Sequence, residues 1–179
     1  SSSLLFVVFS VSALRRFMPK IFFIFGPAKK LPGKFSSGNS ASFSTGGRLP
    51  AAALAPVLNR RLPADLRVRA AAEAPAGFDA RRSAVARRYA YRLLREDDVL
   101  LARFAWHPRR PVDADGLARA TVVLVGEHDC ATFQGAGSTP TVSVCRIQRA
   151  SWRPWDGGVL LDIIADHFLY HMVRSIVGT

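Results

Sequence analysis

The segment Asp162-Ile-Ile-Ala-Asp-His-Phe-Leu-Tyr-His-Met-Val-Arg-Ser-Ile-Val-Gly-Thr179 joins a strand pattern to a helix pattern and decides the fold. Its first residues are apolar and strand-like. After them, apolar residues recur at helical spacing, which predicts a helix with one stripe facing a core. The stripe consists of Phe168, Met172, Val173, Ile176 and Val177. Arg174 lies off this stripe, where an arginine is usually solvated.

Upstream segments complete an α+β pattern. Helices are expected over residues 49–61 and from the capping residue Asp113 to Val125, where Gly126 ends the second one. Strands are expected over residues 66–72 and 84–94, and a hairpin over 142–152 and 159–165. This irregular alternation predicts a mixed or antiparallel sheet with helices packed on one face.

The composition changes abruptly near residues 36–46. All four lysines lie in the first 34 residues, and no Asp or Glu precedes Asp65. We therefore interpret residues 1–40 as a head unrelated to the rest, either disordered or translated from the wrong frame. The alternative is an organelle transit peptide, because the head is basic, free of acids and contains serines.

The net charge of +12 is unevenly distributed. The first 64 residues hold nine basic and no acidic residues, which leaves 12 − 9 = +3 for the remainder. The charge that matters is local, because five arginines are interleaved with Tyr89 and Tyr91. This combination favours an RNA partner, since cations neutralise phosphates and aromatic rings stack on unpaired bases. The alternative is a solvated strand edge. The arginines are Arg81, Arg82, Arg87, Arg88 and Arg92.

The sequence predicts no metal site. Cys130 and Cys145 are too far apart for a C-x-x-C site, and they suit small buried residues in a reducing compartment. His167 and His171 have the i, i+4 spacing of a helical metal pair, but no H-E-x-x-H motif is formed.

Four blocks resemble the tRNA pseudouridine synthase A family. The end of the chain is similar to "AFLHHMVRNIVGT", and the other blocks are similar to "LNxxLPxDIxV", "FHARFSAxxRxYxY" and "LxGxHDFxxF". Those blocks are Leu58–Val68, Phe78–Tyr91 and Leu124–Phe133. The resemblance covers residues 41–179 and implies an incomplete pseudouridine synthase fold, with subdomains at 41–105 and 106–179.

The resemblance also implies a function. The family is an isomerase that converts uridine to pseudouridine in the anticodon stem-loop of tRNA, without cofactor or metal. It implies a cytoplasmic protein with tRNA as its partner, no membrane association and homodimers. Arg174 matches the arginine that pairs with the nucleophilic aspartate, and Tyr89 matches the tyrosine that stacks on the target base. Arg81, Arg88 and His171 match positions near the bound RNA.

Departures from the family pattern qualify this expectation. The catalytic loop "GRTDAGVHA" does not occur in residues 1–179, so we expect a fragment lacking the nucleophile and the C-terminal end, and inactive as given. Asp79, Val142 and Asp166 also replace the usual residues. Two alternatives stay open: a non-catalytic RNA-binding remnant of the family, and a basic ribosome-associated protein.

Overall fold

The computed structural model describes residues 3–11, 21–25, 39–46, 49–64, 66–137 and 142–179. Most of the predicted head and Asp65 therefore lie outside the described residues. The chain forms two compact units, Ser1–Phe17 with Ile24–Val85 (unit 1) and Met18–Phe23 with Ala86–Thr179 (unit 2). That the chain holds pseudouridine synthase subdomains at 41–105 and 106–179 stays a prediction. No helix in the described segments has the length and apolar character that crossing a bilayer requires.

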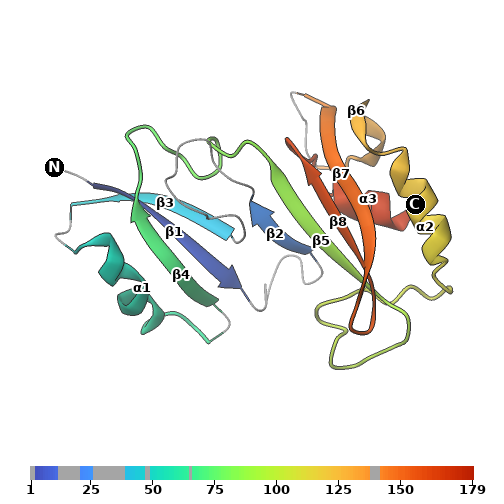
Figure 1. The fold of residues 1–179 in the computed structure, drawn as a ribbon, viewed down its shortest axis with the longest axis horizontal. Coiled ribbons are helices and arrows are strands. Elements are labelled where there is room, and N and C mark those ends of the chain that lie inside the picture. The colour runs from blue at the N-terminus through green and yellow to red at the C-terminus, as the bar shows by residue number, and fades with distance from the viewer. Residues whose placement is uncertain (1–2, 12–20, 26–38, 47–48, 65, 138–141) are drawn as a thin grey trace. The chain divides into compact units, whose positions relative to one another are not determined.

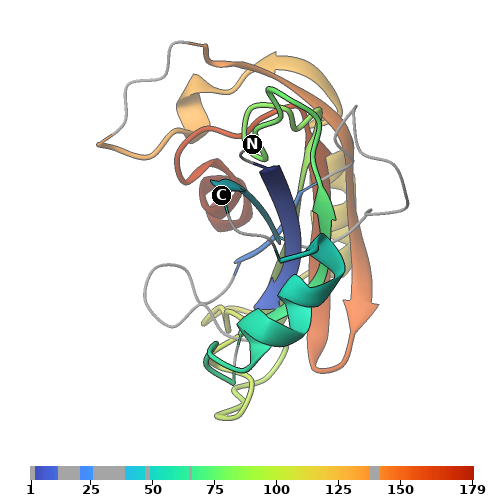
Figure 2. The same ribbon diagram turned by 90° about the vertical axis from the view of Figure 1, so that its left-hand side faces the viewer.

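Unit 1 is a small antiparallel sheet with one helix. Strand β1 (Ser3–Val11) lies between β3 (Asn39–Thr45) and β4 (Leu66–Glu73), and helix α1 (Ala51–Asn59) lies along β4 (Figure 2). The Asn59 side chain fixes this contact, because its amide donates to the Val68 carbonyl at 2.9 Å and its oxygen accepts from the Val68 N–H at 2.8 Å.

Helix α1 continues through Pro56, and Pro50 stands at its N-cap, where a missing N–H costs nothing. Strand β1 of unit 1 and strand β2 (Ile21–Phe25), which belongs to the sheet of unit 2, both fall within the head that was expected to be disordered or mistranslated. That the head is unrelated to the rest of the chain stays a prediction.

Unit 2 is built around a sheet with the strand order β2-β5-β8-β7-β6 (Figure 1). The pairs β5–β8, β7–β8 and β6–β7 are antiparallel. The predicted hairpin is confirmed, with Gly157 (φ 94°) in its turn. The strands are β5 (Arg87–Leu94), β6 (Gly126–Asp129), β7 (Val144–Trp155) and β8 (Gly158–Ala165).

The core of unit 2 lies between one face of this sheet and the helices α2 (Ala114–Val122) and α3 (Met172–Gly178). Asp113 caps α2 as predicted, since its side chain accepts a bond from the Asp115 N–H. The Trp152 indole donates to the Thr121 hydroxyl at 2.7 Å and ties α2 to β7. The expected α+β sheet with helices on one face is confirmed. We call this side the helix face.

The last helix begins later than its apolar spacing predicted. Residues 166–171 form an irregular connection, and His171, at the N-cap of α3, has the left-handed backbone with φ 59°. A left-handed residue breaks the helical ladder, so Phe168 lies before the helix. His167 and His171 therefore do not lie on one helix, as the i, i+4 spacing considered above would require.

A β-bulge divides β7 into two parts. Ile147 pairs with Ala165, whereas Arg149 pairs with Ile164, so Gln148 is an extra residue in this strand. Alternation along the strand changes phase there. Ile147 faces the core, but Arg149, two residues later, faces the other side of the sheet.

Candidate active site

Tyr89 lies near the start of β5, on the helix face. Its ring meets Phe168 edge-on, with 4.7 Å between centroids and 72° between planes. Such T-shaped pairs are favourable because the positive edge of one ring meets the negative face of the other. Burial raises the pKa of Tyr89 to about 12, against the opposing charge of Arg87. Tyr89 is therefore a neutral phenol at physiological pH.

Arg174 lies on the first turn of α3, and its side chain is exposed. Burial raises the pKa of Tyr91, and the positive charge of Arg174 partly opposes this rise. Tyr91 stands two residues after Tyr89 and so shares its face of the sheet. The start of β5 and the end of β8 thus meet the start of α3 on the helix face. This place holds three aromatic side chains and one cation, namely Tyr89, Tyr91, Phe168 and Arg174.

His171 stands beside this group in a fixed pose. Its ring stacks on Tyr170 with centroids 3.9 Å apart, and Tyr170 is 46% exposed. The Gly135 N–H donates to the Tyr170 carbonyl at 2.8 Å. A Cβ on Gly135 would come within 2.9 Å of the His171 side chain, so glycine permits this close approach.

Arg88 is on the opposite side of the sheet from Tyr89, because neighbouring strand residues point to opposite faces. Its Nε and one terminal nitrogen donate to the two carboxylate oxygens of Asp162, each at 2.5 Å. Asp162 is 2% exposed. Its burial opposes ionisation, but the hydrogen bond and charge of Arg88, with the charge of Arg149, lower its pKa.

Arg149 completes this network and was not among the site residues predicted from the sequence. Its terminal nitrogen lies 2.6 Å from the same Asp162 oxygen that binds Arg88. The bulge at Gln148 gives it this orientation. The available signal was a phase change in the apolar pattern, from Cys145 and Ile147 to Ala150 and Trp152.

Arg81 belongs to unit 1. Asp79 accepts the N–H groups of Arg81 at 2.9 Å and Arg82 at 2.7 Å, which shapes the turn that carries both arginines. The bond from Arg82 is the main cause of the lowered pKa of Asp79, although burial opposes it. The acid at position 79 therefore has a local structural role in the turn.

Cys145 is fully buried in the core of unit 2. Its sulfur lies 3.4 Å from the His167 Nε2 and 4.0 Å from the Met172 sulfur. Burial raises the pKa of Cys145 to about 12, and that of Cys130 rises as well. Both are neutral thiols packed as small apolar residues.

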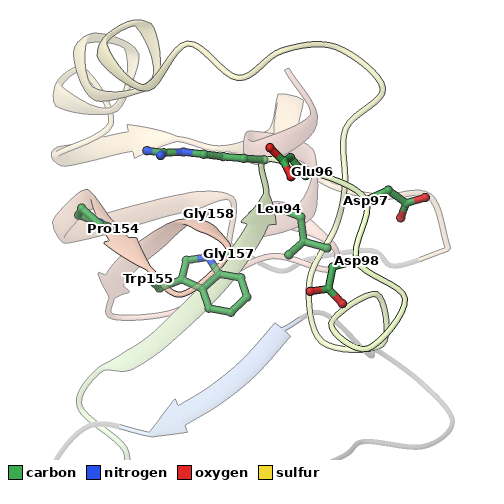
Figure 3. Close-up of a pocket in the computed structure, with 9 residues that line it drawn as sticks. Leu94, Glu96, Asp97, Asp98, Pro154, Trp155, Gly157 and Gly158 are labelled. Carbon is green, nitrogen blue, oxygen red and sulfur yellow. The ribbon is translucent and has the colours of Figure 1, made fainter.

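A cavity of about 410 Å³ lies at the other end of β5, beside the hairpin turn. Figure 3 shows Glu96, Asp97 and Asp98 on the loop that follows this strand, with Trp155 on the hairpin. Asp98 caps the loop by accepting the N–H groups of Leu100 and Leu101 at 2.8 and 3.0 Å. Its three acids outnumber its one cation, Arg95, so this cavity itself is unfavourable for a phosphate group.

The tRNA pseudouridine synthase family model matches residues 120–179, which contain the end of α2, strand β6, the hairpin and α3. Over most of its length the chain matches the tRNA pseudouridine synthase A family. The tRNA pseudouridine synthase A of Moorella thermoacetica is 40% identical over 149 residues, which are 82% of this chain and 61% of that protein. For Halalkalibacterium halodurans the identity is 38% over 82% of this chain and 57% of the relative.

A third synthase A, from Streptomyces avermitilis, is 40% identical over 66% of this chain and 42% of its own length. The chain thus spans at most about three-fifths of the length of these pseudouridine synthases. The resemblance stated from the sequence is confirmed. The roles of Tyr89, Arg174, Arg81, Arg88 and His171 stay predictions.

Proposed function

We propose that this chain is the base-holding part of a tRNA pseudouridine synthase, which isomerises uridine in the anticodon stem-loop of tRNA. The observation that carries the proposal is the group formed by Tyr89, Phe168 and Arg174 on the helix face. Phe168 holds the Tyr89 ring edge-on. The charge of Arg174 acts on Tyr91, two residues along the same strand.

Each member of this group suits one need of the reaction. The target uridine must leave its stack, and a neutral aromatic ring can hold it by stacking. Tyr89 suits this role because its pKa of about 12 keeps it protonated. Arg174 would pair with the nucleophilic aspartate, favour its ionised form and orient it. That aspartate would bond to C1′ of the sugar as the N-glycosidic bond breaks. The detached base would then attack C1′ through its C5, displace the aspartate and lose the C5 proton to solvent.

Asp162 on β8 and Asp166 directly after this strand do not suit the role of this nucleophile. Asp162 faces away from Tyr89 and is held by Arg88 and Arg149. Asp166 accepts the Arg146 N–H at 3.0 Å and bonds its neighbour His167. We propose that the nucleophile comes from a loop of the Gly-Arg-Thr-Asp-Ala-Gly type, and that residues 1–179 alone do not make pseudouridine.

The same proposal includes tRNA as the partner, a cytoplasmic location and a homodimer. Arg81 and Arg88 would contact the RNA together with His171. Sedimentation of the purified chain with and without an anticodon stem-loop RNA tests the assembly.

Release of tritium from C5 of labelled uridine in tRNA tests the activity. A chain extended ahead of Ala41 with the Gly-Arg-Thr-Asp-Ala-Gly loop should release tritium, whereas residues 1–179 should release none. In the extended chain, Arg174→Ala should lower the rate by on the order of 100-fold. Arg174→Lys is the matched control, since it keeps the charge without the planar fork. Release by residues 1–179 alone would contradict the proposal. RNA binding by an extended chain that releases no tritium would favour the non-catalytic remnant.

A further inference from the structure

We propose that the side of the unit 2 sheet opposite the helix face binds RNA phosphates, and that the buried Asp162 is the residue that positions the arginines for this. We call this side the arginine face. It consists of Arg88, Arg92, Arg149 and Arg153 around Asp162. The proposal rests on the proposed function for its RNA ligand and assigns that ligand a second contact surface.

The strand register places the four arginines at the corners of a rectangle. Arg88 and Arg149 both pair with Ile164, and Arg92 and Arg153 both pair with Leu160. Asp162 pairs with Ala90 and Ser151 between these two rows. Direct partners in an antiparallel ladder share a face. The rows lie about 13 Å apart along the strands, and about 10 Å separate β5 from β7.

This arrangement leaves an excess of positive charge. Four arginines surround one carboxylate, so the five side chains carry 4 − 1 = +3. Burial and the repulsion of Arg153 both lower the pKa of Arg92. A cation crowded by another cation gains when an anion approaches. Trp155 lies beside the same corner, with its ring 5.2 Å from the guanidinium carbon of Arg92.

Stability alone does not explain the network at its centre. Apolar residues of similar volume usually stabilise a protein as well as a buried ion pair does. Here the carboxylate takes three N–H donors, two from Arg88 and one from Arg149. The Arg149 side chain is 54% exposed, and Asp162 contacts only one of its nitrogens. Arg149 is thus held by its inner edge while its outer edge faces solvent, which is the pose that a phosphate contact requires.

The role proposed for Asp162 predicts a change in RNA affinity opposite in sign to the change expected from charge alone. If charge alone governed RNA affinity, Asp162→Asn would strengthen binding, because it removes a negative charge from a cationic face. If Asp162 positions Arg88 and Arg149, the same substitution weakens binding although the net charge becomes more positive. The two readings differ in direction, so one measurement separates them.

The experiment measures binding of the full 179-residue chain to a synthetic tRNA anticodon stem-loop by fluorescence anisotropy over a series of salt concentrations. Arg149→Gln and Arg153→Gln should each weaken binding by about five- to tenfold and reduce the salt slope by about one. Arg119→Gln is the matched control, because Arg119 lies on α2 and its side chain is 74% exposed. It should change affinity by less than about twofold.

Asp162→Asn should weaken binding by at least about threefold, with circular dichroism confirming that it is folded. Should that variant not fold, Arg149→Lys answers the same question, since it keeps the charge but loses the planar fork and should also weaken binding. The proposal that the arginine face binds RNA would be overturned if Asp162→Asn bound more tightly. It would also be overturned if the Arg149, Arg153 and Arg119 variants had equal affinities, and neither result would affect the proposed function. Absence of RNA binding by the unaltered chain would overturn it as well. The proposed function fails separately, when the extended chain releases no tritium.

Discussion

Phe168 meets Tyr89 edge-to-face at 4.7 Å, although the two residues belong to different elements and stand far apart in sequence. This contact joins the start of β5 to the connection between β8 and α3. Replacement of either ring by Leu keeps an apolar side chain but removes the aromatic contact. A double-mutant cycle of Tyr89→Leu and Phe168→Leu, measured by urea unfolding, should give a coupling of about 1 kcal/mol. Additive single effects would show that the two rings merely share a core.

The raised pKa of Tyr89 predicts a specific alkaline response. A tyrosine whose folded pKa is about 12 contributes stability that is fully present below the unfolded pKa of about 10. That contribution is lost as the pH rises from about 10 through the folded value. Tyr89→Phe should therefore flatten the loss of stability in this range and remove one late step from the absorbance titration of phenolate. An unchanged titration curve would show that Tyr89 does not ionise in this pH range.

The lowered pKa of Asp162 predicts the opposite dependence of stability on pH. Its contribution to stability is present above the unfolded pKa of about 3.9 and is lost as the pH falls through the lower folded value. The chain should therefore lose stability below about pH 4, and Asp162→Asn should make this acid limb shallower. Thermal melts at a series of pH values measure both. Asp115→Asn, at an exposed acid on α2, should leave the acid limb as it is in the unaltered chain.

The close approach of Gly135 to His171 can be tested by adding one methyl group. Gly135→Ala should displace His171 from its stack on Tyr170 and cost about 1–3 kcal/mol of stability. Gly178→Ala is the control, because no atom lies within 4 Å of the added carbon. Equal melting temperatures for the two variants would show that His171 yields without cost.

Patterns that depend on local spacing predicted most of unit 2. The Asp113 cap, the hairpin and the two tyrosines on one face follow from residue type and period alone. The start of α3 could not be predicted, because Phe168 fits the helical spacing although His171 interrupts the helix. The pairing of Arg149 with Asp162 was missed for a similar reason. It depends on a register between strands, and the sequence of a single strand does not reveal this.

The extra residue at Gln148 makes side-chain direction in β7 depend on chain length as well as on residue type. Gln148 is surplus to the pairing, so its removal would make Ile147 and Arg149 direct neighbours, each still opposite its present partner on β8, and both faces would keep their side chains. The strand would lose only the local bend and the added twist of the bulge. A deletion at any other point of β7 would instead turn one part of the strand over, because side chains alternate between the faces. Related synthases should therefore lack or keep this one residue more readily than they change the length of the strand on either side of it.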